Sequence, residues 1–497
     1  MTCLVPNGGT VINARDQRLV SILSAIVDAP PARSLAAPGA VLLVSCYELG
    51  HQPLSLATPA AALRTAGFRP ATLDASVEQL SDEMILAARL VAISVPMHTA
   101  LRLGAGIAAR VRAMNPAAHI CFYGLYATLN ADHLLGHHHG DSTIGGEYER
   151  PLVALAQALA EDAPVGDLPG IGTRLHPAGP VLEPDSPITP DRTGLPALRD
   201  YAGLERDGAI VPAGYVETTR GCHHVCRHCP ITPVYGGRFV VVSREVVLTD
   251  ARAQIAAGAR HITFGDPDFF NGPGHGLRIL RELHAEFPWL TFDATIKIEH
   301  LIQHQRLLPE LSSLGCAFVV SAVESVSELV LQKLAKGHNR HDIGVALDLL
   351  DAVGIPMRPS LLPFTPWTTE RDYVELLAFV AERDLIDCVD PVHFSIRLLV
   401  PPGSALLDDP ANAGWLGDLD AAAFTYYWLH PDPRLDELQR HIAEVVEDAA
   451  TRDEPARLTF ERIWSATHDV AGRTPPPLPV PVTRRRSPPR LTESWFC

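Results

Sequence analysis

Three cysteines in one short segment are the residues of this chain best suited to chemistry. They lie four and three positions apart in the run Gly221-Cys222-His223-His224-Val225-Cys226-Arg227-His228-Cys229-Pro230. A loop of this length can place three thiolates around one centre. Soft thiolate ligands suit a [4Fe–4S] cluster or a zinc ion.

The number of thiols leaves two kinds of metal site open. An iron–sulfur cluster normally takes four protein ligands, so three cysteines leave one iron free to chelate a small molecule through its amino and carboxylate groups. The alternative is a structural zinc knuckle, in which His223, His224 or His228 supplies the fourth ligand. Structural zinc sites tend to stabilise small modules that lack a core, and this favours the cluster in a large domain.

The elements before the cysteines predict a doubly wound α/β domain over residues 38–165. Apolar runs such as 40–46, 90–95 and 120–126 alternate with helical patterns, and residues 1–37 form an N-terminal extension. This alternation is typical of a parallel sheet, which binds ligands beyond the carboxyl ends of its strands.

A second series of strands and helices must position the cysteines. Prolines and glycines crowd into residues 166–211, which we assign to a linker. Over residues 212–405 we expect six consecutive βα units, with the last strand at 392–399. Six such units make most of a (β/α) barrel, whose chemistry lies at the carboxyl ends of the strands. The cysteines come directly after the first of these strands.

The C-terminal part changes in character. Helical patterns at 421–428 and 434–449 predict a small helical cap over residues 406–473. Residues 474–497 are rich in proline and contain three consecutive arginines, which is typical of an extended, mobile tail. The expected fold class is therefore α/β, with a doubly wound N-terminal domain, a partial (β/α)6 barrel and a C-terminal helical cap.

Composition excludes several classes of protein. Lys and Arg number 41 against 57 Asp and Glu, a formal net charge of −16, which argues against nucleic acid or an anionic membrane as partner. The apolar runs are shorter than the ~20 residues of a membrane span, and the first 16 residues lack the pattern of a signal peptide. Nine cysteines, three of them clustered, favour metal or redox chemistry over disulfides. We expect a cytoplasmic protein.

The cysteine spacing and its place after the first barrel strand resemble the radical S-adenosylmethionine (SAM) superfamily. The N-terminal domain is similar to the cobalamin-binding domain that precedes the barrel in one subgroup. The resemblance is closest to radical SAM proteins with a CUAEP or CCAEP tail, and covers roughly residues 40–497. It is carried by Arg220-Gly221-Cys222, Cys229-Pro230, Pro233-Val234-Tyr235 and the terminal Glu493-Ser494-Trp495-Phe496-Cys497.

The resemblance implies that the three cysteines hold a [4Fe–4S] cluster and that residues at two further strand ends hold SAM. These residues are Gly265, Asp266, Asp268, Ser321 and Glu324. Gly265-Asp266-Pro267 takes the place of the family's Gly-Gly-Glu motif, so Asp266 or Asp268 is the expected acceptor for the SAM ammonium, although Pro267 departs from the pattern. The alternative is that these carboxylates cap helices.

Further charged residues lie at or near the ends of predicted barrel strands. Lys297 and Arg358 are expected to face the cavity and bind the cofactor. Glu299 and Arg397 are expected to face the same cavity. Arginine is a good carboxylate partner because its guanidinium has a fork of donors. A mutual salt bridge on the barrel rim is the alternative.

Cobalamin is a possible second cofactor. The Asp-x-His-x-x-Gly motif that supplies a cobalt ligand in many cobalamin domains is absent. The resemblance then implies contacts from strand-end loops without a lower histidine ligand, with an empty scaffold as the alternative. The candidate residues are Ser94, Gly124, Gly145, Gly146 and Glu147.

The final residue, Cys497, is a candidate redox group. In the family a cysteine at this place is followed by selenocysteine or cysteine and then Ala-Glu-Pro. A chain that stops here is what results when a selenocysteine codon is read as a stop. The complete tail would then carry a vicinal thiol–selenol pair. The alternative is a genuine terminus with an exposed thiol.

Together these observations predict a radical SAM enzyme. It would cleave SAM reductively to methionine and a 5′-deoxyadenosyl radical, for a cobalamin-associated modification, such as methylation, of a small-molecule substrate. The expected electron donor is a flavodoxin or ferredoxin. Two alternatives stay open: transfer of another SAM fragment to a soft acceptor such as arsenic, and a zinc-stabilised binding protein without catalysis.

Overall fold

The N-terminal sheet is built on strands that are apolar along their length. Every residue of β1 (Val41–Ser45) and β3 (Leu90–Ser94) is buried, as expected for parallel strands covered on both faces. The strand order is β2-β1-β3-β4-β5-β6, and only β6 runs antiparallel to its neighbour. The other strands are β2 (Ala71–Asp74), β4 (His119–Tyr123), β5 (Ser142–Ile144) and β6 (Ile171–Gly172).

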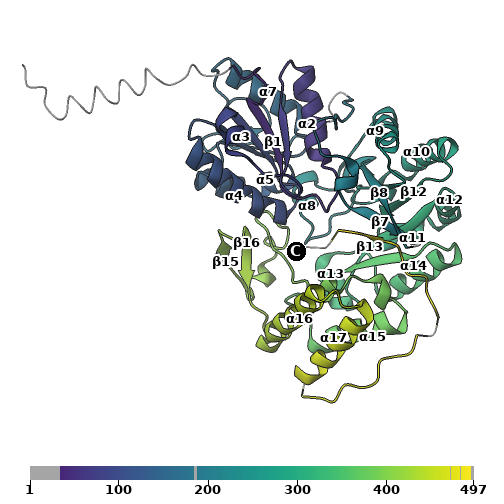
Figure 1. Cartoon of the computed structure of the whole chain (residues 1–497). Coiled ribbons are helices and arrows are strands. Elements are labelled where there is room, and N and C mark those ends of the chain that lie inside the picture. The colour runs from purple at the N-terminus through teal and green to yellow at the C-terminus, as the bar shows by residue number, and fades with distance from the viewer. Residues whose placement is uncertain (1–33, 184–186, 207, 471, 482, 494–497) are drawn as a thin grey trace, which may run out of the picture.

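Helices cover this sheet on both faces (Figure 1). Successive residues of β1 point into two different hydrophobic clusters: Leu42 belongs to one, and Val41 and Leu43 to the other. This alternation is the period-2 geometry of a strand. The helices are α2 (Leu54–Thr65), α3 (Asp82–Ala87), α4 (His98–Met114), α5 (Leu125–Leu129), α6 (Ala131–Gly136) and α7 (Glu149–Ala160).

The computed structural model describes residues 34–183, 187–206, 208–470, 472–481 and 483–493. Most of the expected N-terminal extension and Cys497 therefore lie outside the described residues. Among the described helices, none combines the length with the apolar composition that a bilayer crossing requires.

The second sheet has the order β14-β13-β12-β11-β8-β7-β17 and curls into a half-barrel. The five consecutive strands from the β14 edge to β8 are parallel, while β7 and β17 are antiparallel to their neighbours. The strands are β7 (Gly203–Arg206), β8 (Ala209–Val216), β11 (His261–Phe264), β12 (Thr291–Thr295), β13 (Cys316–Glu324), β14 (Met357–Leu361) and β17 (Arg490–Leu491).

The helices that connect the parallel strands pack on the outside of the half-barrel (Figure 1). They are α9 (Arg244–Ala256), α10 (Pro273–Glu286), α11 (Ile298–Gln303), α12 (Leu308–Ser313), α13 (Glu328–Leu334), α14 (Arg340–Ala352) and α15 (Glu370–Glu382). The expected α/β fold class is confirmed. The prediction of a sixth strand at 392–399 is wrong. Pro391 starts a 3-10 turn, η5 (Pro391–Phe394), and among the described residues only an isolated bridge joins Arg397 to Phe364.

The C-terminal part contains one helix that was expected and a hairpin that was not. The helix expected at 434–449 is α16 (Pro433–Thr451), and it packs on α17 (Ala456–Val470). The helix expected at 421–428 is wrong: β15 (Leu416–Asp420) and β16 (Thr425–Trp428) form an antiparallel hairpin. The aromatic residues of β16 favour a strand, and its buried Trp428 follows an exposed Tyr427.

The arginine- and proline-rich tail is docked where described, so the expectation of a mobile tail is wrong there. Arg485 is buried between Asp348 and Asp351 on α14. Further along, the carbonyl oxygen of Pro489 accepts a hydrogen bond from Arg358 Nη2 on β14 (2.7 Å), and β17 pairs with β7. The tail therefore connects the two edges of the curled sheet.

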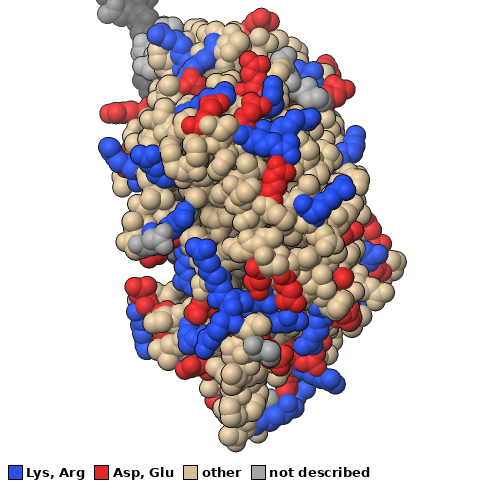
Figure 2. All heavy atoms as spheres, turned by 90° about the vertical axis from the view of Figure 1, so that its right-hand side faces the viewer, with Lys and Arg blue, Asp and Glu red and all other residues tan. Residues whose placement is uncertain are grey.

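The surface in Figure 2 carries Lys and Arg side chains interspersed with Asp and Glu, and the basic side chains are densest across the lower middle of that face.

Candidate active site at the domain junction

The cysteine loop is anchored by a short ribbon at the carboxyl end of the first barrel strand. After β8, β9 (Thr219–Gly221) pairs with β10 (Phe239–Val241), and α8 (Ile231–Tyr235) follows the loop. Gly221 has φ +80°, and a Cβ there would lie 2.4 Å from the Tyr235 ring, so only glycine fits. Within the loop, Cys222 and Cys226 are buried and Cys229 is half-buried.

Two lysines approach the thiols. Lys297 Nζ lies 3.8 Å from Cys226 Sγ and 3.5 Å from Glu299 Oε2. Burial raises the pKa of Cys222 to about 11 and that of Cys229 to about 12, against the opposing charges of Lys297 and Lys336 respectively. These thiols are therefore protonated in the free protein, and binding a cluster or metal would release their protons.

Glu324 forms a buried charged group beside the same loop. Its Oε1 lies 3.1 Å from Lys336 Nζ and 3.3 Å from His228 Nε2. Ser321 is also buried, and its hydroxyl donates to the carbonyl oxygen of Ile296 (2.7 Å). The structure thus brings Glu324 to the cysteine loop, while Ser321 ties two barrel strands together.

Asp266 holds the chain ahead of the cysteines instead of facing a ligand. Its carboxylate accepts hydrogen bonds from Thr218 N (2.9 Å), Thr218 Oγ1 (2.5 Å) and Thr219 Oγ1 (2.7 Å). Burial raises its pKa to about 6. The expectation that Asp266 accepts the SAM ammonium does not agree with these contacts, because Thr218 and Thr219 already surround both oxygens.

Arg358 is likewise not brought to the thiols. Its guanidinium donates to Asp390 Oδ2 (3.1 Å) and to the carbonyl oxygen of Pro489 in the tail. Arg358 therefore belongs to a salt bridge, which was the alternative interpretation. Arg397 pairs with Asp436 and lies over the Trp428 ring, 3.5 Å from its centroid. Both arginines are therefore committed to packing the barrel against its C-terminal segments.

A cavity of about 230 Å³ lies between the N-terminal domain and the mouth of the half-barrel. The residues on both sides of the cysteine loop line it, and so does Gly265, whose Cβ would overlap the Tyr215 phenol if it were any other residue. Of the residues predicted for cobalamin, Ser94, Gly124 and Gly146 line this cavity.

The other two predicted cobalamin residues lie behind the cavity wall. Gly145 packs against Thr128, which a Cβ would overlap. Glu147 pairs with Arg220 Nη1 (2.9 Å) and accepts from the Tyr235 hydroxyl (3.2 Å). Its buried carboxylate joins the N-terminal domain to the cysteine loop.

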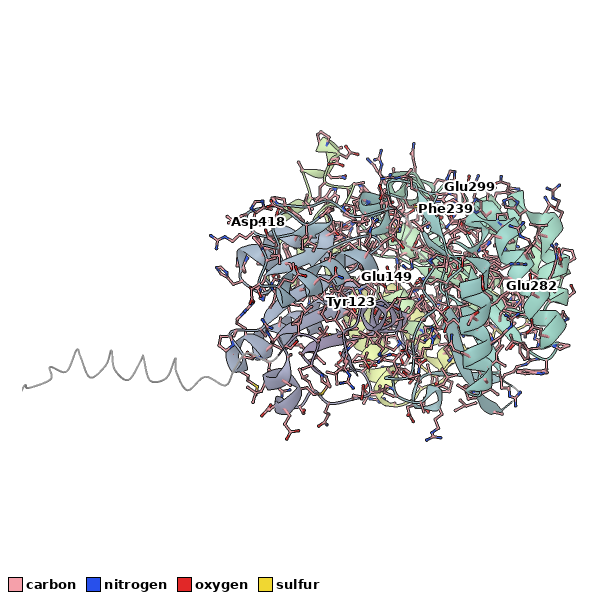
Figure 3. All side chains as sticks on the ribbon, turned by 90° about the horizontal axis from the view of Figure 1, so that it is seen from above. Tyr123, Glu149, Phe239, Glu282, Glu299 and Asp418 are labelled. Atoms are coloured by element: carbon pink, nitrogen blue, oxygen red, sulfur yellow. The ribbon has the colours of Figure 1, made fainter. Side chains whose placement is uncertain are left out.

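Arg220 connects the two domains through three carboxylates. It lies 2.9 Å from Glu147 Oε2, 2.9 Å from Glu149 Oε1 and 3.1 Å from Glu217 Oε2. Glu149 is labelled near the centre of Figure 3, where the N-terminal domain meets the barrel. Burial raises the pKa of Glu147 and Glu217, and Arg220 opposes both shifts.

Two cavity-lining residues were missed as site candidates. Burial raises the pKa of Glu48 to about 7 and lowers that of His51 to about 4. The His51 side chain is buried, and its ring contacts that of Tyr215 with centroids 4.8 Å apart. Both follow β1 at its carboxyl end, which is the one signal that could have singled them out.

Residues 216–380 match the family model of the radical SAM superfamily. Within curated proteins, the chain is 26% identical over 198 residues to a tRNA-2-methylthio-N(6)-dimethylallyladenosine synthase of Desulfosudis oleivorans, covering 38% of this chain and 42% of that protein. It is 22% identical over 268 residues to an uncharacterized methyltransferase of Pyrococcus horikoshii, covering 52% and 56%. The chain thus spans about half the length of these relatives or less.

Solved structures share much of this arrangement. The cobalamin-dependent SAM radical enzyme OxsB, solved with aqua-cobalamin and SAM, covers 82% of this chain and 66% of its own at 14% identity and a TM-score of 0.62. The radical SAM methyltransferase TsrM of Kitasatospora setae, solved with tryptophan substrate and a SAM analogue, covers 69% and 71% at 20% identity and a TM-score of 0.57. The chain contains a radical SAM domain and has the fold of cobalamin-dependent radical SAM methyltransferases. This supports the expectation of an enzyme.

Proposed function

We propose that this protein is a radical SAM enzyme whose Cys222, Cys226 and Cys229 hold a [4Fe–4S] cluster. The observation that carries the proposal is the position of the three thiols: they lie on one loop at the carboxyl end of the half-barrel, and the residues flanking this loop line the junction cavity. The match over residues 216–380 supports the same assignment.

A bound, reduced [4Fe–4S] cluster supplies the electron that cleaves SAM into methionine and a reactive adenosyl fragment. The protein's own residues set the conditions for that step. Burial of Cys222 and Cys226 keeps water away from these two thiols, and Lys297 places a positive charge 3.8 Å from Cys226 Sγ. Glu324, held by Lys336 at the carboxyl end of β13, offers a carboxylate at the same end of the half-barrel, where the SAM amino acid is expected.

We further propose that the junction cavity receives cobalamin and that the reaction is a methylation of a small-molecule substrate. Ser94, Gly124 and Gly146 lie at strand ends that face the cysteine loop across the cavity, and bulky side chains are absent at all three. OxsB was solved with aqua-cobalamin, and TsrM was solved with cobalamin in one structure and with its tryptophan substrate in another. A flavodoxin or ferredoxin in the cytoplasm is the proposed electron donor.

Anaerobic reconstitution with iron and sulfide, followed by SAM and dithionite, tests the first part. We expect 5′-deoxyadenosine from the wild type and from Cys316→Ala, whose thiol lies at the opposite end of the barrel strands from the loop. We expect at least a 100-fold lower yield from Cys226→Ala. Stoichiometric zinc, no labile sulfide and no 5′-deoxyadenosine would instead establish the zinc-stabilised binding protein.

Retention of hydroxocobalamin after desalting tests the second part. Met97 lines the cavity, so Met97→Trp should fill it and weaken cobalamin binding about 10-fold. The matched control is Leu103→Trp, on the exposed side of α4. Equal retention by both variants would contradict the proposed cobalamin site.

A further inference from the structure

Two histidines and an aspartate converge beside the cysteine loop. His224 lies within the loop, Asp268 follows β11, and His300 lies on α11 after β12. His300 Nδ1 is 2.8 Å from Asp268 Oδ2, and His224 Nε2 is 3.4 Å from the same oxygen. All three donor atoms lie within 4.8 Å of one another.

These three atoms lack hydrogen bonds of normal geometry among the described residues. Asp268 is fully buried, and His300 is 7% exposed, yet Asp268 Oδ2, His224 Nε2 and His300 Nδ1 have no such partner. The two short contacts to Asp268 therefore do not run along an N–H bond. Buried polar atoms are nearly always satisfied, so three unsatisfied atoms at one point indicate a missing ligand that all three share.

The two separations from Asp268 Oδ2 fit common coordination of one metal ion. Zinc binds histidine nitrogen and carboxylate oxygen at about 2.0–2.2 Å, so two ligands of one ion lie about 3.0 Å apart at a right angle and about 3.4 Å apart at the tetrahedral angle. The observed 2.8 and 3.4 Å are close to these values.

The surroundings hold the donors in place. Asp268 Oδ1 accepts a hydrogen bond from Phe270 N (3.0 Å), which leaves Oδ2 to the histidines. His224 Nδ1 lies 3.7 Å from Glu299 Oε2, on the other side of its ring from Asp268. Histidines that bind metals commonly have a carboxylate near their second nitrogen, and Glu299 takes that position here without a direct hydrogen bond. Glu299 is labelled towards the edge of the molecule in Figure 3.

We propose that His224, Asp268 and His300 bind one divalent transition-metal ion of the zinc or iron(II) type, separate from the cysteine cluster. Two imidazoles and one carboxylate are the donor set of mononuclear sites that keep open positions. The ion connects the loops after β8, β11 and β12. The site does not depend on the proposed SAM chemistry, because none of its ligands is a cysteine.

Cobalt(II) is a direct probe, because its visible absorption distinguishes nitrogen and oxygen ligands from thiolates. The full-length protein carrying its reconstituted cluster is treated with a mild chelator, desalted and titrated anaerobically with Co²⁺. We expect one equivalent to bind without thiolate charge-transfer bands. The variant Cys222→Ala/Cys226→Ala/Cys229→Ala should bind the same equivalent, whether or not the protein cleaves SAM.

Conservative variants locate the site. His300→Gln and Asp268→Asn should weaken Co²⁺ binding at least 10-fold, while His223→Gln, the exposed neighbour of His224, should bind as the wild type does. If the wild type with its iron–sulfur cluster binds no cobalt, the proposal is overturned. This outcome does not depend on whether any variant folds. Unchanged binding in His300→Gln and Asp268→Asn, or loss of the ion in the cysteine variant, would overturn it as well.

Discussion

Lys336 and Glu324 are opposite charges buried together beside the cysteine loop. Burial alone would raise the pKa of Glu324, but Lys336 and His228 together outweigh it and hold that pKa well below its usual range. Neither residue is more than 9% exposed. In such a pair each charge offsets the desolvation penalty of the other, so removing one partner destabilises the protein more than removing both.

We therefore expect Lys336→Met to destabilise the protein by about 3–5 kcal/mol, because it leaves the Glu324 carboxylate buried without its cation. Urea unfolding of the cluster-free protein measures this. The double variant Lys336→Met/Glu324→Gln should recover part of the loss. A double variant less stable than the single one would contradict the explanation.

Glu48 predicts a dependence of stability on pH. Burial raises its pKa from the usual 4.5 to about 7, so the folded protein holds a proton here that the unfolded chain has released. This contribution to stability is full below about pH 4.5 and is lost as the pH rises through 7. Glu48→Gln should thus be more stable than the wild type at pH 8 by up to about 3 kcal/mol, with a smaller difference at pH 5. Thermal unfolding at both pH values measures it, and an equal difference at both would exclude this cause.

At the residue scale, the sequence predicted which residues carry chemistry better than it predicted which residues they contact. The three cysteines were evident because their spacing is local. Asp266 and Asp268 were both plausible ligand contacts, but Asp266 turns to Thr218 while Asp268 turns to two histidines. Which way a carboxylate points depends on loops distant in the sequence, and no local pattern encodes that.

At the scale of elements, buried strands were predictable because they are continuous apolar runs of β-forming residues. The hairpin of β15 and β16 was not, because aromatic residues occur in both helices and strands and the alternation there is short. The docking of the tail was also missed. Its proline-rich composition favours an extended chain, but composition does not show that Arg485 finds two aspartates on α14.

The tail provides an element-scale prediction. The Arg485 side chain is 3% exposed and also donates to the carbonyl oxygens of Arg383 and Leu347. Arg485→Ala should detach the tail from α14, lower stability by about 2–4 kcal/mol and speed tryptic cleavage nearby. Its control is Arg484→Ala, since the Arg484 side chain is 82% exposed. Equal proteolysis of the two variants would show that Arg485 does not hold the tail.

At the scale of the whole molecule, Arg220 joins the two domains over the junction cavity. Arg220→Gln should leave Glu147, Glu149 and Glu217 buried without their cation and cost about 3–5 kcal/mol near neutral pH. Because burial raises the pKa of Glu147 and Glu217, both carboxylates take up protons as the pH falls, and the loss should be smaller at pH 5 than at pH 8.

Scanning calorimetry at the two pH values tests this coupling, with Arg238→Gln, an exposed arginine near the same loop, as control. If Arg220 couples the domains, its variant should unfold in two resolved transitions at pH 8, one for each α/β domain, where the control unfolds in one. A single, unshifted transition in Arg220→Gln would mean that apolar packing across the junction holds the domains together without the ion pairs. Arg220 would then only shape the wall of the cavity.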